Sequence, residues 1–399
     1  MELLKNQTRI SDELIDLINV LADEIIITKK KLTIDYDFLE KILGATLINE
    51  VNVPKKPKMS IKPIIPIEKS KMLSIVLDFF KSIDEDFYKQ AVSIMLHQNK
   101  NLKLNIYNIN KINNFNQINE MGILENTERA GVFYNGAAAT INIPTKRALS
   151  PEESEKVLKD NECLLEDAYV LVHEIGHLLD CELESKAIFG NDILSPGNCV
   201  TKTTVTSYLL TESTAATFEM LFTEYLLANN ICSKDAVIQI LNGIFERWFD
   251  YVQIVYIELL LAKEKELNET ISKEFVEKMM EQNGWTPEFV ENGIKYIVNF
   301  PDDMVYASRY AIANLVAPTI AETYNQKGAE PLLEYCEMVK NNNLKKALKT
   351  VGISLNKIGI EQLINKAFNR VGVQLRGKQL EKALANRQSY YNRVNEIDR

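Results

Sequence analysis

The most informative part of the sequence is LLEDAYVLVHEIGHLLD, residues 164–180. Its many leucine, isoleucine and valine residues predict a helix that is buried on most sides. His173 and His177 are four residues apart, and residues at this spacing lie one above the other on a helix. Two imidazole nitrogens can therefore reach one ion, while Glu174 is rotated by about 100° around the helix axis. The pattern predicts a metal site with a carboxylate beside it.

Histidine is rare in this chain, which makes the motif more specific. The sequence has three histidines, and two of them lie in H-E-x-x-H. A chance match in a chain of this composition is on the order of one in several hundred. The alternative is a pair of core histidines with local hydrogen bonds. We prefer a Zn²⁺ site, in which Glu174 is the general base that takes a proton from water activated by the zinc.

A tetrahedral zinc site with two histidines still needs a third protein ligand. The best candidate segment is LLTESTAATFEMLFTEYLL, residues 209–227, where Glu212, Ala216, Glu219 and Thr223 share one helical face. The small residues 213–216 would let this helix approach another closely. We assign Glu212 as the third ligand and Glu219 as a carboxylate that orients a ligating imidazole. The alternative is that both glutamates face solvent, as most helical glutamates do.

The remaining sequence predicts a mainly α fold with a small antiparallel sheet just before the motif helix. Almost everything after residue 150 is predicted to be helical, residues 102–109 alternate as strands do, and residues 131–144 have a turn signal between two expected strands. Proline and glycine mark the expected turns and helix ends. The expected elements are helices over 2–28, near 36–43 and over 70–98, strands over 102–109 and 131–144 with a turn at Asn135-Gly136, helix starts at Ser150-Pro151, Ser233 and Thr286-Pro287, and helix ends at Gly284 and Gly328.

The segment VNVPKKPKMSIKPIIPIEK, residues 51–69, contains four prolines and many lysines. Proline fixes φ and removes a backbone donor, so this segment is expected to be an extended arm or linker. It divides the chain into a small N-terminal helical segment, 1–50, and a helical main body, 70–399, which is expected to be the zinc metallopeptidase domain.

Composition excludes several classes of protein. Hydrophobic residues make up 46% and charged residues 25%, which are globular proportions, and the net charge of −9 argues against a general nucleic-acid binder. We find no stretch long enough for a membrane span and no standard secretory signal. The five cysteines form no C-x-x-C pair, so reduced thiols and a cytoplasmic location are expected.

HEIGH followed by ESTAATFE resembles the thimet oligopeptidase and oligoendopeptidase F family of helical gluzincins. The resemblance implies a deep cleft, a zinc ion held by His173, His177 and Glu212, and Glu174 as the base. Glu219 matches the second glutamate of the family's downstream helix. The implied activity is a metalloendopeptidase acting on oligopeptides.

The resemblance runs from about residue 70 to 370. Residues 129–144 are similar to the family's edge strand along the cleft. Tyr306 and Tyr310, in MVYASRYAIANLVA, match tyrosines that donate hydrogen bonds to the oxyanion, although ordinary amphipathic packing is the alternative. Near Asn299 the family often has a histidine that this sequence lacks. The third histidine, His97, is expected to be structural.

Three functions remain open from sequence. The first is a peptidase that acts on oligopeptides or unfolded chains. The second is a protease with a specific protein substrate, of the toxin or effector kind and exported into another cell, which the short region before residue 70 and the Pro/Lys arm suggest. The third is a helical protein that binds zinc without catalysis. The oligomeric state is left open.

Overall fold

The structure is a computed structural model. It describes residues 10–32, 42–43, 65–96, 102–108, 131–135, 138–145, 159, 161–189, 205–298, 306–340, 343–354 and 356–371.

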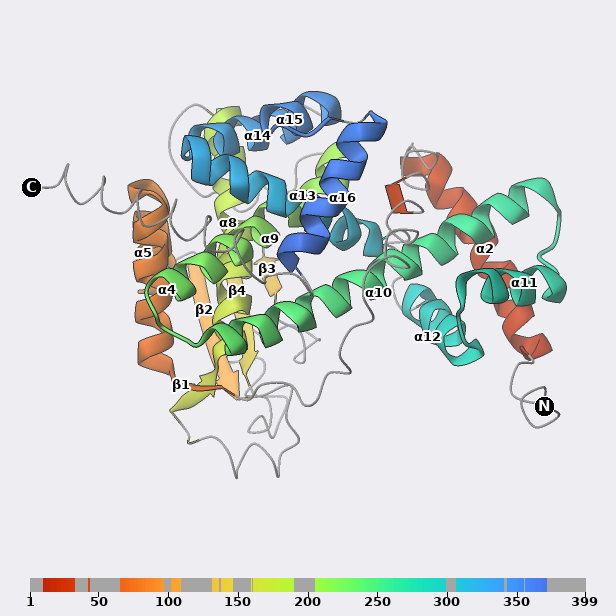
Figure 1. The fold of residues 1–399 in the computed structure, drawn as a ribbon, viewed down its shortest axis with the longest axis horizontal. Coiled ribbons are helices and arrows are strands. Elements are labelled where there is room, and N and C mark those ends of the chain that lie inside the picture. Colours follow the sequence, from red (N-terminus) through yellow and green to blue (C-terminus); the bar gives the residue numbers. More distant parts are fainter. Residues whose placement is uncertain are drawn as a thin grey trace, which may run out of the picture. The chain divides into compact units, whose positions relative to one another are not determined.

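The chain divides into two compact units, which are described separately (Figure 1). The first unit comprises residues 1–55 and 245–312, and the second comprises residues 56–244 and 313–399. The proposed arm lies mostly outside the described residues, so the predicted division at 51–69 stays a prediction.

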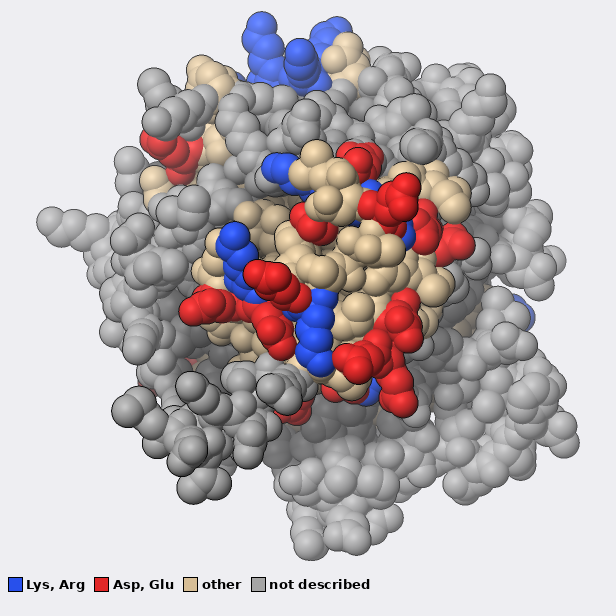
Figure 2. Space-filling view, turned by 90° about the vertical axis from the view of Figure 1, so that its right-hand side faces the viewer, with Lys and Arg blue, Asp and Glu red and all other residues tan. Residues whose placement is uncertain are grey.

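In the first unit, the described secondary-structure elements are all helices. Asn19 ties its first helix to the segment before α11: its side-chain amide donates to the Ile271 carbonyl at 3.0 Å and accepts from the Ile271 N–H at 2.8 Å. On the face shown in Figure 2, acidic side chains border an area of uncharged ones, with some Lys and Arg among them. The helices are α2 (Asp12–Leu32), the later part of α10 (Lys234–Leu267), α11 (Lys273–Asn283), α12 (Pro287–Val298) and the start of α13 (Tyr306–Lys327).

The predicted helix ends in and near this unit are confirmed by their capping geometry. The hydroxyl oxygens of Ser233 and Thr286 accept backbone N–H groups from the first turns of α10 and α12, at 3.2 Å in each case. Gly284 follows α11 with φ 66°, and Gly328 follows α13 with φ 82°. These are left-handed conformations, in which glycine avoids a Cβ clash.

The second unit is mainly helical with two small sheets, which confirms the predicted fold class. The helix predicted over 70–98 is two helices, because Asp84 ends α4 and its carboxylate caps α5 by accepting from the N–H groups of Asp86 and Phe87. The helices are α4 (Lys69–Ile83), α5 (Glu85–Met95), α8 (Leu165–Phe189), α9 (Val205–Ala228), the start of α10, the end of α13, α14 (Glu330–Lys340), α15 (Leu344–Thr350) and α16 (Lys357–Val371).

The larger sheet has the strand order β2-β4-β3 and packs against α8 through β3 and β4 (Figure 1). β3 (Gly131–Asn135) and β4 (Ala138–Thr145) are antiparallel, as predicted. β2 (Leu102–Asn108), however, runs parallel to β4, so this sheet is mixed and the expectation of a purely antiparallel sheet needs correction. A parallel pair requires a long crossover, and the chain between β2 and β4 is long enough to provide it.

A second sheet leads directly into the motif helix. β1 (Pro66–Glu68) pairs antiparallel with β5 (Glu162–Leu164), and α8 begins at the next residue. The Asp167 carboxylate accepts the Leu164 N–H at 2.8 Å, which satisfies a donor at the helix start. The start of α8 is therefore fixed by both the strand pair and a cap.

Aromatic side chains form the core that holds α4, α8 and α9 together. Phe79 of α4 contacts Phe222 of α9 edge-on at 5.1 Å between ring centroids, and Tyr169 of α8 contacts the same ring at 5.2 Å. Phe80 meets Phe218 in the same manner at 5.6 Å. These pairs prefer tilted geometries, so they fix how the helices are rotated as well as how close they lie.

Two composition-based expectations can be compared with the described part of the chain. Among the described helices, none is long and apolar enough to cross a membrane. Cys163 and Cys232 are free thiols, and Cys163 is buried. The side chains of the other three cysteines lie outside the described residues.

Candidate metal centre

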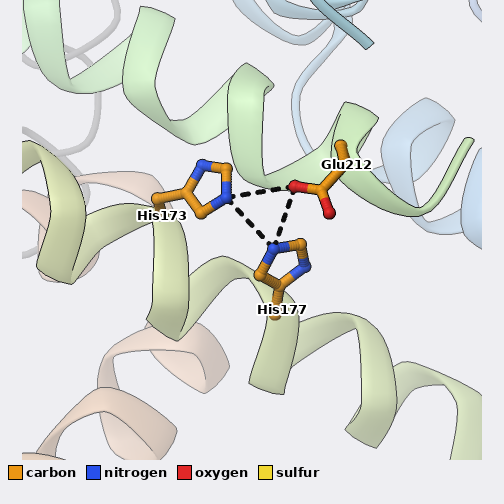
Figure 3. A group of neighbouring side chains, drawn as sticks. All are labelled: His173, His177 and Glu212. Atoms are coloured by element: carbon orange, nitrogen blue, oxygen red, sulfur yellow. Dashed lines mark hydrogen bonds and ion pairs between the residues drawn. The ribbon is translucent and has the colours of Figure 1, made fainter. Parts of the chain in front are cut away.

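The two motif histidines and Glu212 lie together, as Figure 3 shows. Nε2 of His173 and Nε2 of His177 are 3.1 Å apart, and each lies 3.2 Å from Oε2 of Glu212. Both imidazoles come from adjacent turns of α8, and the carboxylate comes from α9. The side chain of Glu212 is 5% exposed, so the alternative that it faces solvent is wrong.

The three atoms form a nearly equilateral triangle that fits a tetrahedral metal ion. Ligands about 2.0–2.1 Å from zinc at tetrahedral angles are about 3.3 Å from one another, close to the observed separations. Neutral imidazoles and a carboxylate are also ligands that zinc prefers. The residues present therefore fit a zinc ion, although other transition metals accept the same donors.

The Glu219 carboxylate lies against the imidazole of His173. Its Oε1 lies 2.8 Å from Nδ1 of His173, and its side chain is 16% exposed. An imidazole that donates from Nδ1 to this carboxylate presents the lone pair of Nε2 toward His177 and Glu212. This is the arrangement that the sequence pattern suggested for Glu219, and its role stays a prediction.

Glu174 is 7% exposed and follows His173 on α8. Its negative charge contributes to a raised pKa for both motif histidines. A buried carboxylate beside two imidazoles is suited to accept and release a proton.

The pKa values of His173, His177 and Glu212 are shifted by the interactions among these side chains. Burial alone would lower the pKa of His173, but hydrogen bonds with Glu212 and Glu219 outweigh it and place this pKa well above 6.5. Burial would likewise lower the pKa of His177, and the Glu212 charge raises it instead. Burial would raise the pKa of the Glu212 carboxyl, yet the charge of His177 and hydrogen bonds with both imidazoles hold it well below 4.5.

Close packing of α8 on α9 brings the ligands together. Gly176 lies against Ala215 so tightly that a Cβ atom there would be 3.0 Å from the Ala215 Cα and 3.1 Å from Cδ2 of Phe218. Ala215, one of the small residues that suggested a close approach, is thus at the contact. Glycine in the motif allows the helix backbones to approach until Glu212 reaches the imidazoles.

Two hydrogen bonds link α9 to neighbouring helices on either side of this contact, and the sequence did not predict them. Tyr169 reaches Thr223, and Tyr335 of α14 reaches Ser213. Tyr169 and Thr223 could have been found from their helical spacing to His173 and Glu219. Tyr335 is 122 residues from Ser213, and nothing in the sequence indicates their contact.

The proposed tyrosines belong to a different part of the structure. Tyr310 lies in the first unit, where its ring stacks on Tyr251 at 4.8 Å, the packing role that the pattern also allowed. The side chain of Tyr306 lies outside the described residues, as do His97, Asn299, Gly136 of the predicted turn and the helix start at Ser150-Pro151. Their assignments stay predictions.

Comparison with known proteins gives little further guidance. No family model and no curated protein matches the sequence. One solved structure, described as a putative peptidase from Chlamydophila abortus, is similar with a TM-score of 0.49 and 14% identity. The match covers 94% of this chain and 55% of that one. A likeness at this level does not establish a shared activity.

Proposed function

We propose that this protein is a zinc metallopeptidase of the H-E-x-x-H type. One observation carries the proposal: three lone-pair atoms, from His173, His177 and Glu212, converge within 3.1–3.2 Å of one another beside the buried Glu174. Such a set of acceptors needs either shared protons or a cation, and the triangle has the dimensions of a zinc site.

A bound zinc ion would supply Lewis-acid chemistry, polarising the scissile carbonyl and lowering the pKa of an attacking water. Glu174 would take the proton from that water and pass it to the leaving amine as the peptide C–N bond breaks. His173, His177 and Glu212 would hold the ion, and Glu219 would keep Nδ1 of His173 protonated. We propose Tyr306 and Tyr310 as donors to the developing oxyanion.

The motif and its downstream glutamate support a place among divergent relatives of thimet oligopeptidase and oligoendopeptidase F. Peptides or unfolded segments are the proposed substrates, because that family acts on oligopeptides, and the proposed location is the cytoplasm. A specific protein substrate is the second candidate within the same chemistry.

The test is metal analysis combined with digestion of a quenched peptide library and a panel of folded proteins. We expect about one zinc ion per chain and peptide hydrolysis that a chelator abolishes and added zinc restores. If the chain binds zinc but hydrolyses no substrate, the result would favour a helical protein that binds zinc without catalysis. If it cleaves only folded proteins efficiently, the result would favour a protease with a specific protein substrate. A chain that takes up no zinc would refute the proposal.

A further inference from the structure

Two buried hydrogen-bond chains end at the turns of α9 that carry the metal-site glutamates. In the first, the Tyr335 hydroxyl lies 2.8 Å from Oγ of Ser213, which itself donates to the Leu210 carbonyl. A serine hydroxyl has one hydrogen, so Tyr335 must be the donor to Ser213. Ser213 directly follows Glu212, and this chain therefore closes the turn that presents the Glu212 carboxylate.

The second chain has the same chemistry further along α9, where Thr223 lies ten residues after Ser213 and Glu219 lies seven residues after Glu212. The Tyr169 hydroxyl lies 3.1 Å from Oγ1 of Thr223, which donates to the Glu219 carbonyl at 2.8 Å. Tyr169 is consequently the donor to Thr223. Tyr169 is also one turn before His173 on α8, so this bond links the two helices next to the His173–Glu219 pair.

All four hydroxyl-bearing residues are buried, with exposures of 0–4%. Serine and threonine hydroxyls that bond back to a helix carbonyl can bend the helix, and a further donor fixes the rotamer that does so. A phenylalanine at either tyrosine position would fill nearly the same volume without bringing a polar group into the core. Packing alone therefore does not account for the phenol groups.

We propose that Tyr169 and Tyr335 are positioning residues of the metal site. Through Thr223 and Ser213 they fix the turns of α9 that hold Glu219 and Glu212 against the imidazoles. This inference rests on the proposed function, since it assigns the tyrosines to a site that binds metal. Neither hydroxyl contacts the three candidate ligands, so both act through α9.

The experiment measures Zn²⁺ affinity by chelator competition, and the visible absorption spectrum of the Co²⁺-loaded chain, for Tyr169→Phe and Tyr335→Phe. We expect zinc affinity to fall about three- to tenfold, less than the 10–100-fold typical of losing a direct partner of a ligand. We also expect a changed Co²⁺ spectrum, because the ligand geometry shifts. Thr223→Val should behave as Tyr169→Phe does, and Thr223→Ser should restore wild-type affinity.

Tyr324→Phe is the matched control. Tyr324 is 2% exposed in the same unit, and its hydroxyl donates to the Ile83 carbonyl at 2.5 Å, on α4 rather than α9. This variant should keep wild-type zinc affinity even if it lowers the unfolding midpoint. Affinities within twofold of wild type for both tyrosine variants, or an equal loss in the control, would overturn the inference. If a tyrosine variant does not fold, the Thr223 pair decides. Wild-type protein that binds no zinc would instead overturn the proposed function.

Discussion

Gly176 of α8 and Ala215 of α9 are in such close contact that a Cβ atom on Gly176 would lie 3.0 Å from the Ala215 Cα. On α8, Gly176 lies next to His177 and about one turn after His173, and on α9 Ala215 lies about one turn after Glu212. The spacing between the helices at this point therefore controls whether the carboxylate reaches both imidazoles.

Gly176→Ala should weaken zinc binding and lower the free energy of unfolding. The added methyl group meets the Ala215 Cα atom and the ring of Phe218, so α9 must move by a few tenths of an ångström, and overpacking of this kind typically costs about 1–3 kcal/mol. Gly243→Ala is the control, because a Cβ there meets nothing within 4 Å. Urea unfolding should show Gly243→Ala stabilised by up to about 1 kcal/mol. Equal stabilisation of both variants would mean that the helix contact is not tight.

Glu219→Ala should reduce zinc affinity by about 10–100-fold, because the Nδ1–H of His173 loses its acceptor and the ring is free to rotate. Glu219→Gln keeps an acceptor oxygen but removes the charge, so its loss should be smaller. Competition with a chromogenic chelator measures both. Identical affinities for wild type and Glu219→Ala would exclude the orienting role.

Glu174→Gln should abolish peptide hydrolysis while the chain still binds zinc, because the amide cannot accept the proton from water. Glu212→Gln should instead lose most of the bound zinc, since it removes a charged ligand. Metal analysis and peptide cleavage, run on the same preparations, separate the two roles. Full activity in Glu174→Gln would show that another group is the base.

The metal-free protein should lose stability as the pH rises above about 6.5 and passes through the raised pKa values of His173 and His177 in the folded state. The pKa values of His173 and His177 are raised in the folded state, so their contribution is fully present below 6.5 and is lost as the pH passes the folded values. The pKa of Glu212 is lowered, so its contribution is present above 4.5 and disappears as the pH falls further. Thermal unfolding with a chelator present measures this dependence.

Zinc should reverse that trend, because the metal binds imidazoles whose Nε2 carries no proton. Zinc affinity should rise with pH, and calorimetry in buffers of different ionisation enthalpy should detect protons released on binding near neutral pH. A His173→Gln, His177→Gln double variant should lose both effects. Metal binding without proton release would contradict the raised pKa values.

Tyr306→Phe or Tyr310→Phe should lower kcat, by up to about 10²–10³-fold for whichever tyrosine donates to the oxyanion, with little change in KM or zinc content. Tyr251→Phe is the control, since its ring stacks on Tyr310. A loss in Tyr310→Phe that Tyr251→Phe reproduces would point to packing instead of catalysis.

The sequence by itself predicted the structural features that depend on residues a few positions apart. Helical spacing predicted that His173 and His177 lie on one face of α8, and the serine, threonine and glycine signals predicted several helix ends, because both depend on backbone geometry over a few residues. The turn signal at Asn135-Gly136 within residues 131–144 also predicted the β3–β4 pair.

Only the tertiary structure decided which distant residues meet. Helical periodicity could place Glu212 and Glu219 on one face of α9, but it could not say whether that face meets solvent or the imidazoles. That outcome depends on the Gly176–Ala215 contact and on the aromatic core, which fixes the orientation of α9 about its axis. The parallel pairing of β2 with β4 and the bond between Tyr335 and Ser213 were equally hidden, because contacts between distant segments follow from the packing of the whole unit rather than from local spacing.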